Sequence, residues 1–390
     1  MPIVLILDQE ITRMLEKPVI IIGGGIWGSI LALRLRHHHP NLRFEIYESS
    51  DRLGDGLSCS FHRSDISSEH FSWLRPYLSH QWREFAVEFP GFSKVYQDSY
   101  CLLRSQDLDL HVRRMLPEDS LFLKTSIELE EALKRGSFVI DTRPNGYFKA
   151  IGYQKSLELH LEVERGHGIK SPVTVDARVE QRDAFRFLQV LPLEENRFVV
   201  KDTRYSARPS LYEEYFEEDI LNDCELRGLR VKEVISREHE FRKIPVERFV
   251  ADNSQRVIRL EGFYHDLTGD VLPDALRLIE RMVKTSFRYG ELKEVIRNYH
   301  QERESKKRIL RGLNHLLYKS SSPCSERYLY LQSLYQLPRG VREKFYAGDL
   351  EVSDIVLALL QKPLLPFLRL LPQVVLKNFG TTSPALPSRN

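Results

Sequence analysis

The chain has 390 residues, with 57 Lys and Arg against 55 Asp and Glu, and its formal net charge at pH 7 is +2. A chain of this length can form two or three lobes around a sizeable core. Because the charges nearly cancel, the protein has no long-range field for nucleic acid, and nucleic acid is not an expected partner.

Residues 1–17 precede the first predicted strand and are interpreted as an N-terminal extension. They include a short apolar run, but they lack leading positive charges and a small-residue cleavage site. The segment is therefore not expected to be a signal peptide.

The next segment predicts a strand, a glycine-rich turn, a helix and a second strand. Its apolar run Val19–Ile22 leads into Gly23, Gly25 and Gly28 at G-x-G-x-x-G spacing. Such glycines allow a tight turn, close approach of the backbone to a pyrophosphate, and close packing of helix on strand. Glu48 follows the second strand, where a carboxylate accepts hydrogen bonds from ribose hydroxyls and repels a 2′-phosphate. The pattern predicts a site for FAD or NAD rather than NADP.

The middle of the chain changes character. Residues 100–133 favour helices and connectors, and residues 137–144 a short strand. Residues 153–204 form successive alternating runs separated by glycine, proline or charged turns, which predicts a meandering antiparallel sheet with one buried face. An acidic helix is predicted over residues 212–228, and strands resume at residues 239–249.

The C-terminal third is predicted to be helical after a strand and a loop within residues 257–278. Pro273 marks the start of the first of these helices. The apolar segment Ile355–Leu376 contains three prolines as well as Lys362 and Arg369. Such a segment cannot be a regular spanning helix. It could lie in a membrane interface, with Lys362 and Arg369 at the level of the lipid headgroups. It could equally cover the protein's own core.

These elements predict an α/β fold with three parts after the extension. A Rossmann-like, discontinuous FAD-binding domain is expected from residues 18–150 and 245–290. An antiparallel-sheet substrate domain is expected from residues 151–244. Residues 291–390 are expected to form a C-terminal helical region that contains the segment suited to membrane-surface contact.

The four cysteines give no sign of a metal or disulfide framework. Cys59, Cys101, Cys224 and Cys324 lie far apart with no C-x-x-C pair. This spacing favours ordinary thiols in a reducing compartment. We therefore expect no metal site and a cytoplasmic protein, with peripheral contact at the inner face of the membrane as the further option.

Several motifs together resemble those of lycopene cyclases of the bacterial beta-cyclase type, which are related to the plant enzymes. The resemblance runs from Val19 to about Leu371. The motifs that carry it are GGGIWGSILALRL, SFH at residues 60–62, VIDTRP, VTVDARVEQRDAFRFLQVLPL, the DTRY after it, GFYHDLTGDVLP, and FYAGDLEVSDIVLALLQKPLLP.

The resemblance implies a flavoprotein that binds FAD, keeps it reduced with NAD(P)H as the possible electron donor, and causes no net redox change. A proton is delivered to the terminal double bond of a linear carotenoid. The resulting carbocation closes a six-membered ring, and a different proton leaves. The implied partner is thus a carotenoid or another long apolar polyene.

The resemblance also assigns roles to individual positions. Gly23, Gly25, Gly28 and Glu48 match the nucleotide fingerprint of the family. His265 matches a histidine that is implicated in catalysis. Thr268 and Gly269 match a Thr-Gly pair that lines the flavin, whereas Asp270 stands where the family has a tyrosine.

Lys201 departs from the family at a glutamate that is held to be essential for cyclisation. A carboxylate about 5 Å from a carbocation contributes roughly 3 kcal/mol of attraction at an effective dielectric constant of about 20. An ammonium repels by a similar amount, so the swing of about 6 kcal/mol corresponds to roughly 10⁴ in rate.

The sequence leaves two ways in which the missing glutamate could be compensated. Asp202 could replace the glutamate if a bulge or register change turned it to the same face. Burial could make Lys201 neutral, so that it acts as a base. The candidate catalytic residues are therefore His265, Lys201 and Asp202.

Three functions stay open on the sequence. The leading hypothesis is a lycopene cyclase-type enzyme of carotenoid biosynthesis, an intramolecular lyase or isomerase. The alternative is an FAD-dependent oxidoreductase that acts on a polyene or another apolar substrate. The third is a catalytically silent homologue.

Overall fold

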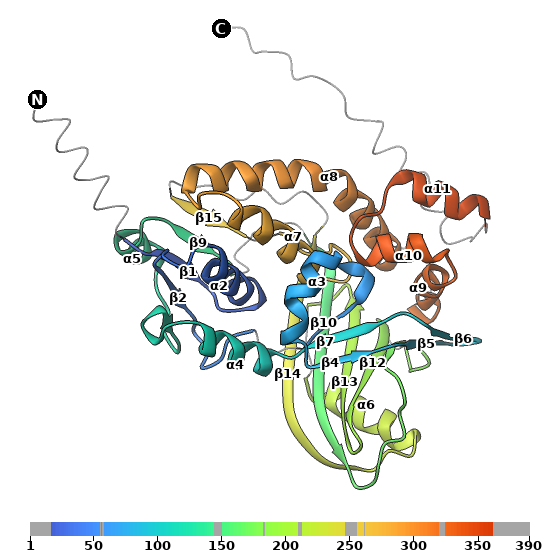
Figure 1. Ribbon diagram of the computed structural model, residues 1–390. Coiled ribbons are helices and arrows are strands. Elements are labelled where there is room, and N and C mark those ends of the chain that lie inside the picture. The colour runs from blue at the N-terminus through green and yellow to red at the C-terminus, as the bar shows by residue number, and fades with distance from the viewer. Residues whose placement is uncertain are drawn as a thin grey trace, which may run out of the picture.

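The computed structural model describes residues 17–361, apart from 55, 57, 144–149, 182–183, 210–212, 246–255, 261 and 320–323. Within these residues, a small parallel sheet and a long antiparallel sheet form two neighbouring parts of the molecule, and the C-terminal helices extend past both (Figure 1). The predicted α/β fold is confirmed, with a parallel sheet, an antiparallel sheet and C-terminal helices.

The parallel sheet has the order β15-β9-β1-β2-β8. Its central strand is the β-branched run predicted from the sequence, and all four residues of that run are buried. A strand buried on both faces needs such a continuous apolar run. The bounds are β1 Val19–Ile22, β2 Phe44–Tyr47, β8 Leu121–Phe122, β9 Val139–Asp141 and β15 Val257–Arg259.

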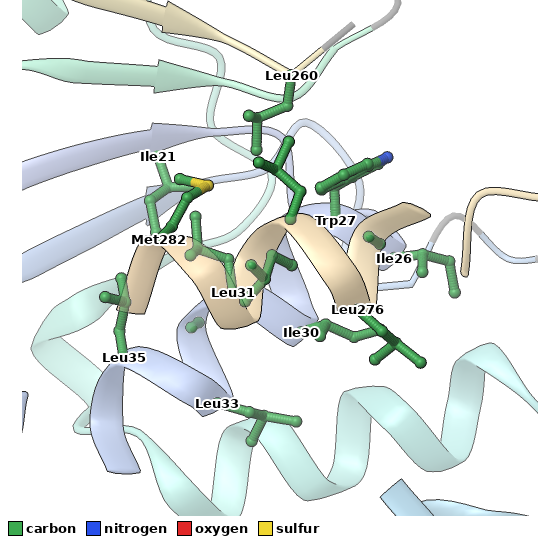
Figure 2. Close-up of a cluster of buried hydrophobic side chains, with 14 of the residues drawn as sticks. Ile21, Ile26, Trp27, Ile30, Leu31, Leu33, Leu35, Leu260, Leu276 and Met282 are labelled. Carbon is green, nitrogen blue, oxygen red and sulfur yellow. The ribbon is translucent and has the colours of Figure 1, made fainter. Parts of the chain in front are cut away.

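Helix α2 (Ile26–His38) is held between the sheet, α4 (Ser105–Met115) and α7 (Leu272–Val283). Its buried residues run without a break from Ile26 to Leu35, because neighbours cover it on several sides. Figure 2 shows side chains of α2 gathered with Leu276 and Met282 of α7 in one apolar cluster. Burying a leucine or isoleucine side chain contributes about 1.5–3 kcal/mol, so this cluster fixes the glycine loop ahead of α2.

The larger sheet has the order β14-β10-β13-β12-β11-β5-β6. The alternating runs predicted over residues 153–204 are β10 to β13, and they are antiparallel as expected, but they pair in the order β10-β13-β12-β11 rather than in chain order. β14 adds a further antiparallel strand beside β10. Helix α6 (Glu213–Leu226), the predicted acidic helix, packs on one face of these strands. The bounds are β5 Phe85–Phe89, β6 Phe92–Tyr96, β10 Ala150–Val163, β11 Val173–Asp176, β12 Phe185–Glu194, β13 Arg197–Ser206 and β14 Val231–Pro245.

Strands β5 and β6 come from a part of the chain that was expected to belong wholly to the nucleotide-binding domain. They form a hairpin, and β5 extends the large sheet by pairing in parallel with β11. The turn contains Gly91 at φ +76°, a conformation that glycine adopts without strain. The proline and glycine between two apolar runs were the signal for this hairpin.

A third, three-stranded sheet has the order β3-β7-β4 and joins the two larger ones. Residues 100–133 therefore contain strands as well as helices, which corrects the prediction of helices and connectors alone. Short apolar runs such as β7 do not distinguish strand from helix by periodicity. The bounds are β3 Cys59–His62, β4 His80–Trp82, β7 Tyr100–Leu103, α3 Ser68–Leu74 and α5 Leu129–Arg135, with single 3₁₀ turns at Arg63–Asp65, Arg75–Tyr77 and Glu118–Ser120.

The predicted helical C-terminal region is present as far as the described residues reach. It comprises α8 Tyr289–Lys319, α9 Tyr328–Tyr335, α10 Arg339–Tyr346 and α11 Val352–Gln361, with a 3₁₀ turn at Cys324–Glu326. No helix among the described residues has the length and apolar character needed to cross a membrane. Most of the segment predicted to cover the core or a membrane surface, residues 362–376, lies outside the described residues.

Candidate functional site

The glycine loop has the geometry that the spacing predicted. Gly23 adopts φ +99°, and helix α2 begins directly after Gly25. A Cβ on Gly28 would overlap the carbonyl oxygen of Gly23, so only glycine lets the helix approach the strand this closely. The first turn of a helix carries N–H groups that the helix itself cannot use and that suit a phosphate.

Glu48 lies against this loop. Its Oε2 accepts a hydrogen bond of 2.7 Å from the backbone N–H of Gly24, and its Oε1 accepts one of 2.7 Å from that of Ser50. The loop is also held from the other side, because the N–H of Gly54 donates to the carbonyl of Gly24 at 2.8 Å. The end of β2 and the glycine loop therefore form one rigid corner, called here the glycine corner, which carries the Glu48 carboxylate.

A cavity lies between the antiparallel sheet, strand β3, the loop 265–270 and the C-terminal helices. Its volume, measured as the space open to the centres of water-sized molecules, is about 170 Å³, and its mouth opens to solvent. Just over half of its lining residues are aromatic or aliphatic, and most of the rest are polar or charged. The aromatic lining includes Phe61, Tyr100, Phe185, Phe187, Tyr205, Tyr335, Phe345 and Tyr346.

The sheet register explains which polar groups reach this cavity. On β13, Lys201, Thr203 and Tyr205 alternate onto the cavity face. Their partners on β10 are Glu158, Ser156 and Gln154, and the partners of these on β14 are Glu238, Glu240 and Arg242. Three strands thus present a grid of charged and polar side chains on one face of the sheet.

Lys201 forms an ion pair within this grid. Its Nζ lies 3.1 Å from Oε2 of Glu240, reaching across β10. Burial opposes the charged form, but Glu240 and Glu158 outweigh it and raise the pKa of Lys201 above its usual value. Burial likewise opposes the charge of Glu240, but Lys201 and Arg242 lower the pKa of Glu240 to about 2. Both shifts favour a charged Lys201 over the neutral form considered from the sequence.

Glu158 lies beneath this pair and is fully buried. Its Oε1 accepts from the backbone N–H of Ser58 at 3.2 Å and lies 3.1 Å from Nε2 of His160. Its Oε2 has no hydrogen-bond partner within the described part of the chain. The pattern Glu-x-Glu-x-Arg on β14 was the signal for charges on this face, but the pairing across β10 is not visible in sequence.

Asp202 points to the opposite face of the sheet, as strand alternation requires. There it accepts hydrogen bonds from Arg186 Nε at 2.9 Å and from Arg204 Nη2 at 2.7 Å. The same two arginines bind Asp223 and Asp219 of α6. The pairing of β13 is regular around Asp202, so no bulge brings it to the cavity.

His265 has both ring nitrogens engaged. Its Nε2 lies 2.8 Å from the carbonyl oxygen of Phe345, which only accepts, so Nε2 carries the proton. The backbone N–H of Thr268 donates to its Nδ1 at 3.0 Å. Burial lowers the pKa of His265, consistent with a neutral ring. His265 thus ties the loop 265–270 to the end of α10.

Thr268 and Gly269 occupy different places in this loop. Thr268 lines the cavity, and its hydroxyl donates to Asp270 at 2.6 Å. Gly269 adopts φ +79° and lies under the guanidinium of Arg242, where a Cβ would overlap it. Asp270 also lines the cavity, on the same side as Lys201, whose pKa it helps to raise.

The structure also places a residue in the cavity that the sequence did not single out as functional. His62, the last residue of the SFH motif and of β3, lines the cavity beside Asp65.

The fold places the three candidate catalytic residues differently. It brings Lys201 to the cavity, places His265 in the wall behind the cavity and turns Asp202 away.

Comparison with known proteins identifies the family. Residues 18–371 match the family described as lycopene cyclase protein. The lycopene beta-cyclase of Pantoea ananas is 26% identical over 380 residues, covering 92% of this chain and 97% of that protein. The lycopene beta-cyclase of a Paracoccus species is 29% identical over 382 residues, covering 91% and 97%.

Solved structures share the fold at low sequence identity. A geranylgeranyl bacteriochlorophyll reductase-like protein from Thermoplasma acidophilum has a TM-score of 0.59 at 11% identity, covering 92% of this chain and 99% of that one. A tryptophan C-6 flavin-dependent halogenase from taromycin biosynthesis has a TM-score of 0.55 at 12% identity, covering 92% and 96%. Such likeness shows the fold alone. The match over residues 18–371, together with the two beta-cyclases, shows that the chain belongs to the lycopene cyclase family.

Proposed function

We propose that the protein is an FAD-dependent lycopene cyclase, which closes rings at the ends of a linear carotenoid without net redox change. The observation that carries the proposal is the cavity, which adjoins β3 and the loop 265–270 and has nine Phe and Tyr rings among its 26 lining residues. A long apolar polyene gains binding energy by burial against such a wall. The family and the two beta-cyclase relatives support this class of reaction.

The glycine corner fits the nucleotide end of FAD. Gly23, Gly25 and Gly28 would accommodate the pyrophosphate at the start of α2, and Glu48 would accept hydrogen bonds from the ribose. The flavin-dependent halogenase among the fold neighbours supports a flavin rather than NAD. When bound, reduced FAD supplies an electron-rich ring system beside the substrate. NAD(P)H is the reductant that we propose.

The cavity suits a reaction that passes through a carbocation. The faces of aromatic rings attract cations, and many aromatic rings line the cavity. The ammonium of Lys201 is paired with the carboxylate of Glu240. Because the two charges are opposite and close together, the pair repels a carbocation less than a lone ammonium would. His265 enters this proposal as a positioning residue for the loop 265–270, and Asp202 does not enter it. Membrane-surface contact of residues 355–376 stays a prediction.

The direct test is expression in cells that accumulate lycopene, followed by pigment chromatography. We expect a product with one or two rings. Protein that is soluble and flavin-loaded, yet forms no cyclic product, would contradict the proposal. Consumption of NAD(P)H or oxygen in proportion to polyene would instead favour the oxidoreductase, and the absence of any turnover with polyene still bound would favour the silent homologue.

Gly28→Ala is expected to reduce the flavin content of the purified protein by roughly fivefold or more. The added Cβ overlaps the carbonyl oxygen of Gly23, and such overpacking costs about 1–3 kcal/mol. Flavin absorbance per mole of protein measures the effect. Gly290→Ala is the matched control, since nothing lies within 4 Å of the added Cβ there. Equal flavin content in both variants would contradict the assignment of the glycine corner.

A further inference from the structure

His62 is the histidine with an unengaged ring nitrogen at the cavity. Its residue is 7% exposed, and its ring lines the cavity. Three aromatic rings surround it, with centroids at 4.7 Å for Phe85, 5.0 Å for Tyr100 and 4.4 Å for Tyr346. Within the described part of the chain, its Nε2 has no hydrogen-bond partner. Buried polar atoms are usually paired, so an orphaned one at a cavity indicates a ligand or a reaction.

Asp65 orients this ring. Its Oδ2 lies 3.2 Å from Nδ1 of His62 and accepts a second hydrogen bond of 2.8 Å from the backbone N–H of the same residue. A carboxylate only accepts, so the contact with the ring is a hydrogen bond when Nδ1 carries the proton. The Nε2 lone pair is then left free at the cavity. Asp65 is itself 5% exposed, so its charge acts at close range in a region with little water.

Within the described ranges, no ionised side chain other than Asp65 contacts the His62 ring. Tyr100 and Tyr346 are neutral at ordinary pH, because burial raises the pKa of each well above its usual value. Arg63 is next in sequence but turns away, donating to the carbonyl of Ile66 and the hydroxyl of Ser68. The charge that faces His62 closely is therefore that of Asp65.

We propose that His62 is the base that removes the proton which ends ring closure, and that Asp65 is its positioning residue. The inference rests on the proposed cyclase function. The Nε2 lone pair forms the new N–H bond with a hydrogen on the carbon next to the cationic carbon. The electron pair of the broken C–H bond becomes the ring double bond. The positive charge passes from substrate to imidazolium, where Asp65 balances it.

The other cavity groups suit this step less well. Lys201 is protonated and paired with Glu240, so it cannot accept a proton. His265 uses both ring nitrogens within the wall. Asp270 accepts a hydrogen bond from Thr268, and a carboxylate is ordinarily a weaker base than imidazole by about two to three pKa units.

The test uses full-length, flavin-loaded protein and compares His62→Gln, His62→Ala, Asp65→Asn and Asp65→Glu with wild type. We expect at least a 100-fold loss of cyclic product for His62→Gln with flavin content unchanged, the usual minimum for losing a general base. Added imidazole should restore part of the activity of His62→Ala. Asp65→Asn should lose about tenfold or more, and Asp65→Glu should recover part of that loss.

His70→Gln is the matched control, because His70 is equally buried but lies on α3 outside the cavity. It should keep wild-type activity. If wild type forms rings and His62→Gln forms them within threefold, the inference is overturned while the proposed function stands. If wild type forms no ring at all, the proposed function is overturned instead.

A nitrogen-15 NMR spectrum of the histidine rings supplies a readout that does not depend on turnover. Neutral His62 should carry its proton on Nδ1 in wild type, and Asp65→Asn should shift the ring toward the other tautomer. A proton on Nε2 in neutral wild-type protein would overturn the assignment of His62 as the base. A purely structural role would leave the imidazole rescue without effect.

Discussion

Lys201→Glu is expected to speed ring formation by roughly 30-fold in single-turnover measurements on reduced, flavin-loaded protein. The new carboxyl would face Glu240, and two adjoining carboxyls hold one proton between them. The local net charge then falls from zero to −1. At about 8 Å from a carbocation and an effective dielectric constant of about 20, this attraction is about 2 kcal/mol, or roughly 30-fold in rate.

The variant Lys201→Gln distinguishes the effect of net charge from the effect of a carboxyl group that can donate a proton. It also leaves a net charge of −1, carried by Glu240, but it adds no carboxyl. Equal acceleration in both variants would assign the effect to charge alone, whereas acceleration only in Lys201→Glu would assign it to the carboxyl. A loss of activity in both variants, with flavin retained, would show that the ammonium itself takes part in the reaction.

Wild type and Lys201→Glu should also differ in how their activity depends on pH. In wild type the pKa of Glu240 is about 2, against an ordinary value of 4.5, so its stabilising contribution is complete above about pH 4.5 and is lost as the pH falls toward 2. Removal of Lys201 raises the pKa of Glu240, so activity of Lys201→Glu should titrate between about pH 4 and 7. In wild type, Glu240 should contribute no transition in this pH range, because its pKa is about 2.

Asp202→Ala is expected to lower the free energy of unfolding by about 3 kcal/mol while leaving the flavin content and ring products of the remaining folded protein unchanged. The substitution removes a carboxylate from Arg186, which is 3% exposed, and from Arg204. Breaking a buried ion pair costs about 3–5 kcal/mol, and the contacts of both arginines with α6 place this case at the low end.

Denaturant unfolding followed by fluorescence measures this loss. Glu217→Ala is the matched control, since Glu217 also joins α6 to the sheet, but through an ion pair with Arg237 that is partly exposed. It should cost no more than about 1 kcal/mol. An Asp202→Ala protein of wild-type stability that forms no rings would restore Asp202 as a catalytic candidate.

The parts of the fold that sequence predicted are those set by local pattern. Gly23, Gly25 and Gly28 lie where a strand, a turn and a helix impose them, and the alternation over residues 153–204 fixes the faces of the sheet. Alternation also implied that Lys201 and Asp202 point apart, which they do. These features depend on neighbours a few residues away.

The parts that sequence did not predict depend on pairing between distant strands. Glu240 neutralises Lys201 only because β10 holds β13 and β14 on either side of it. The ring of His265 is held in the wall by the carbonyl of Phe345, which lies on α10, far along the chain. His62 reaches the cavity at the end of β3, which pairs with β7 from a later part of the chain. No short-range pattern encodes these contacts.

The order of strands in the parallel sheet has a consequence for synthesis of the protein. β15 pairs with β9, yet strands β10 to β14 of the large sheet intervene between them in the chain. A nascent chain that has not yet emerged past residue 259 therefore exposes the open edge of β9, which invites pairing with other chains. The parallel sheet cannot be completed on the ribosome before strands β10 to β14 have been made.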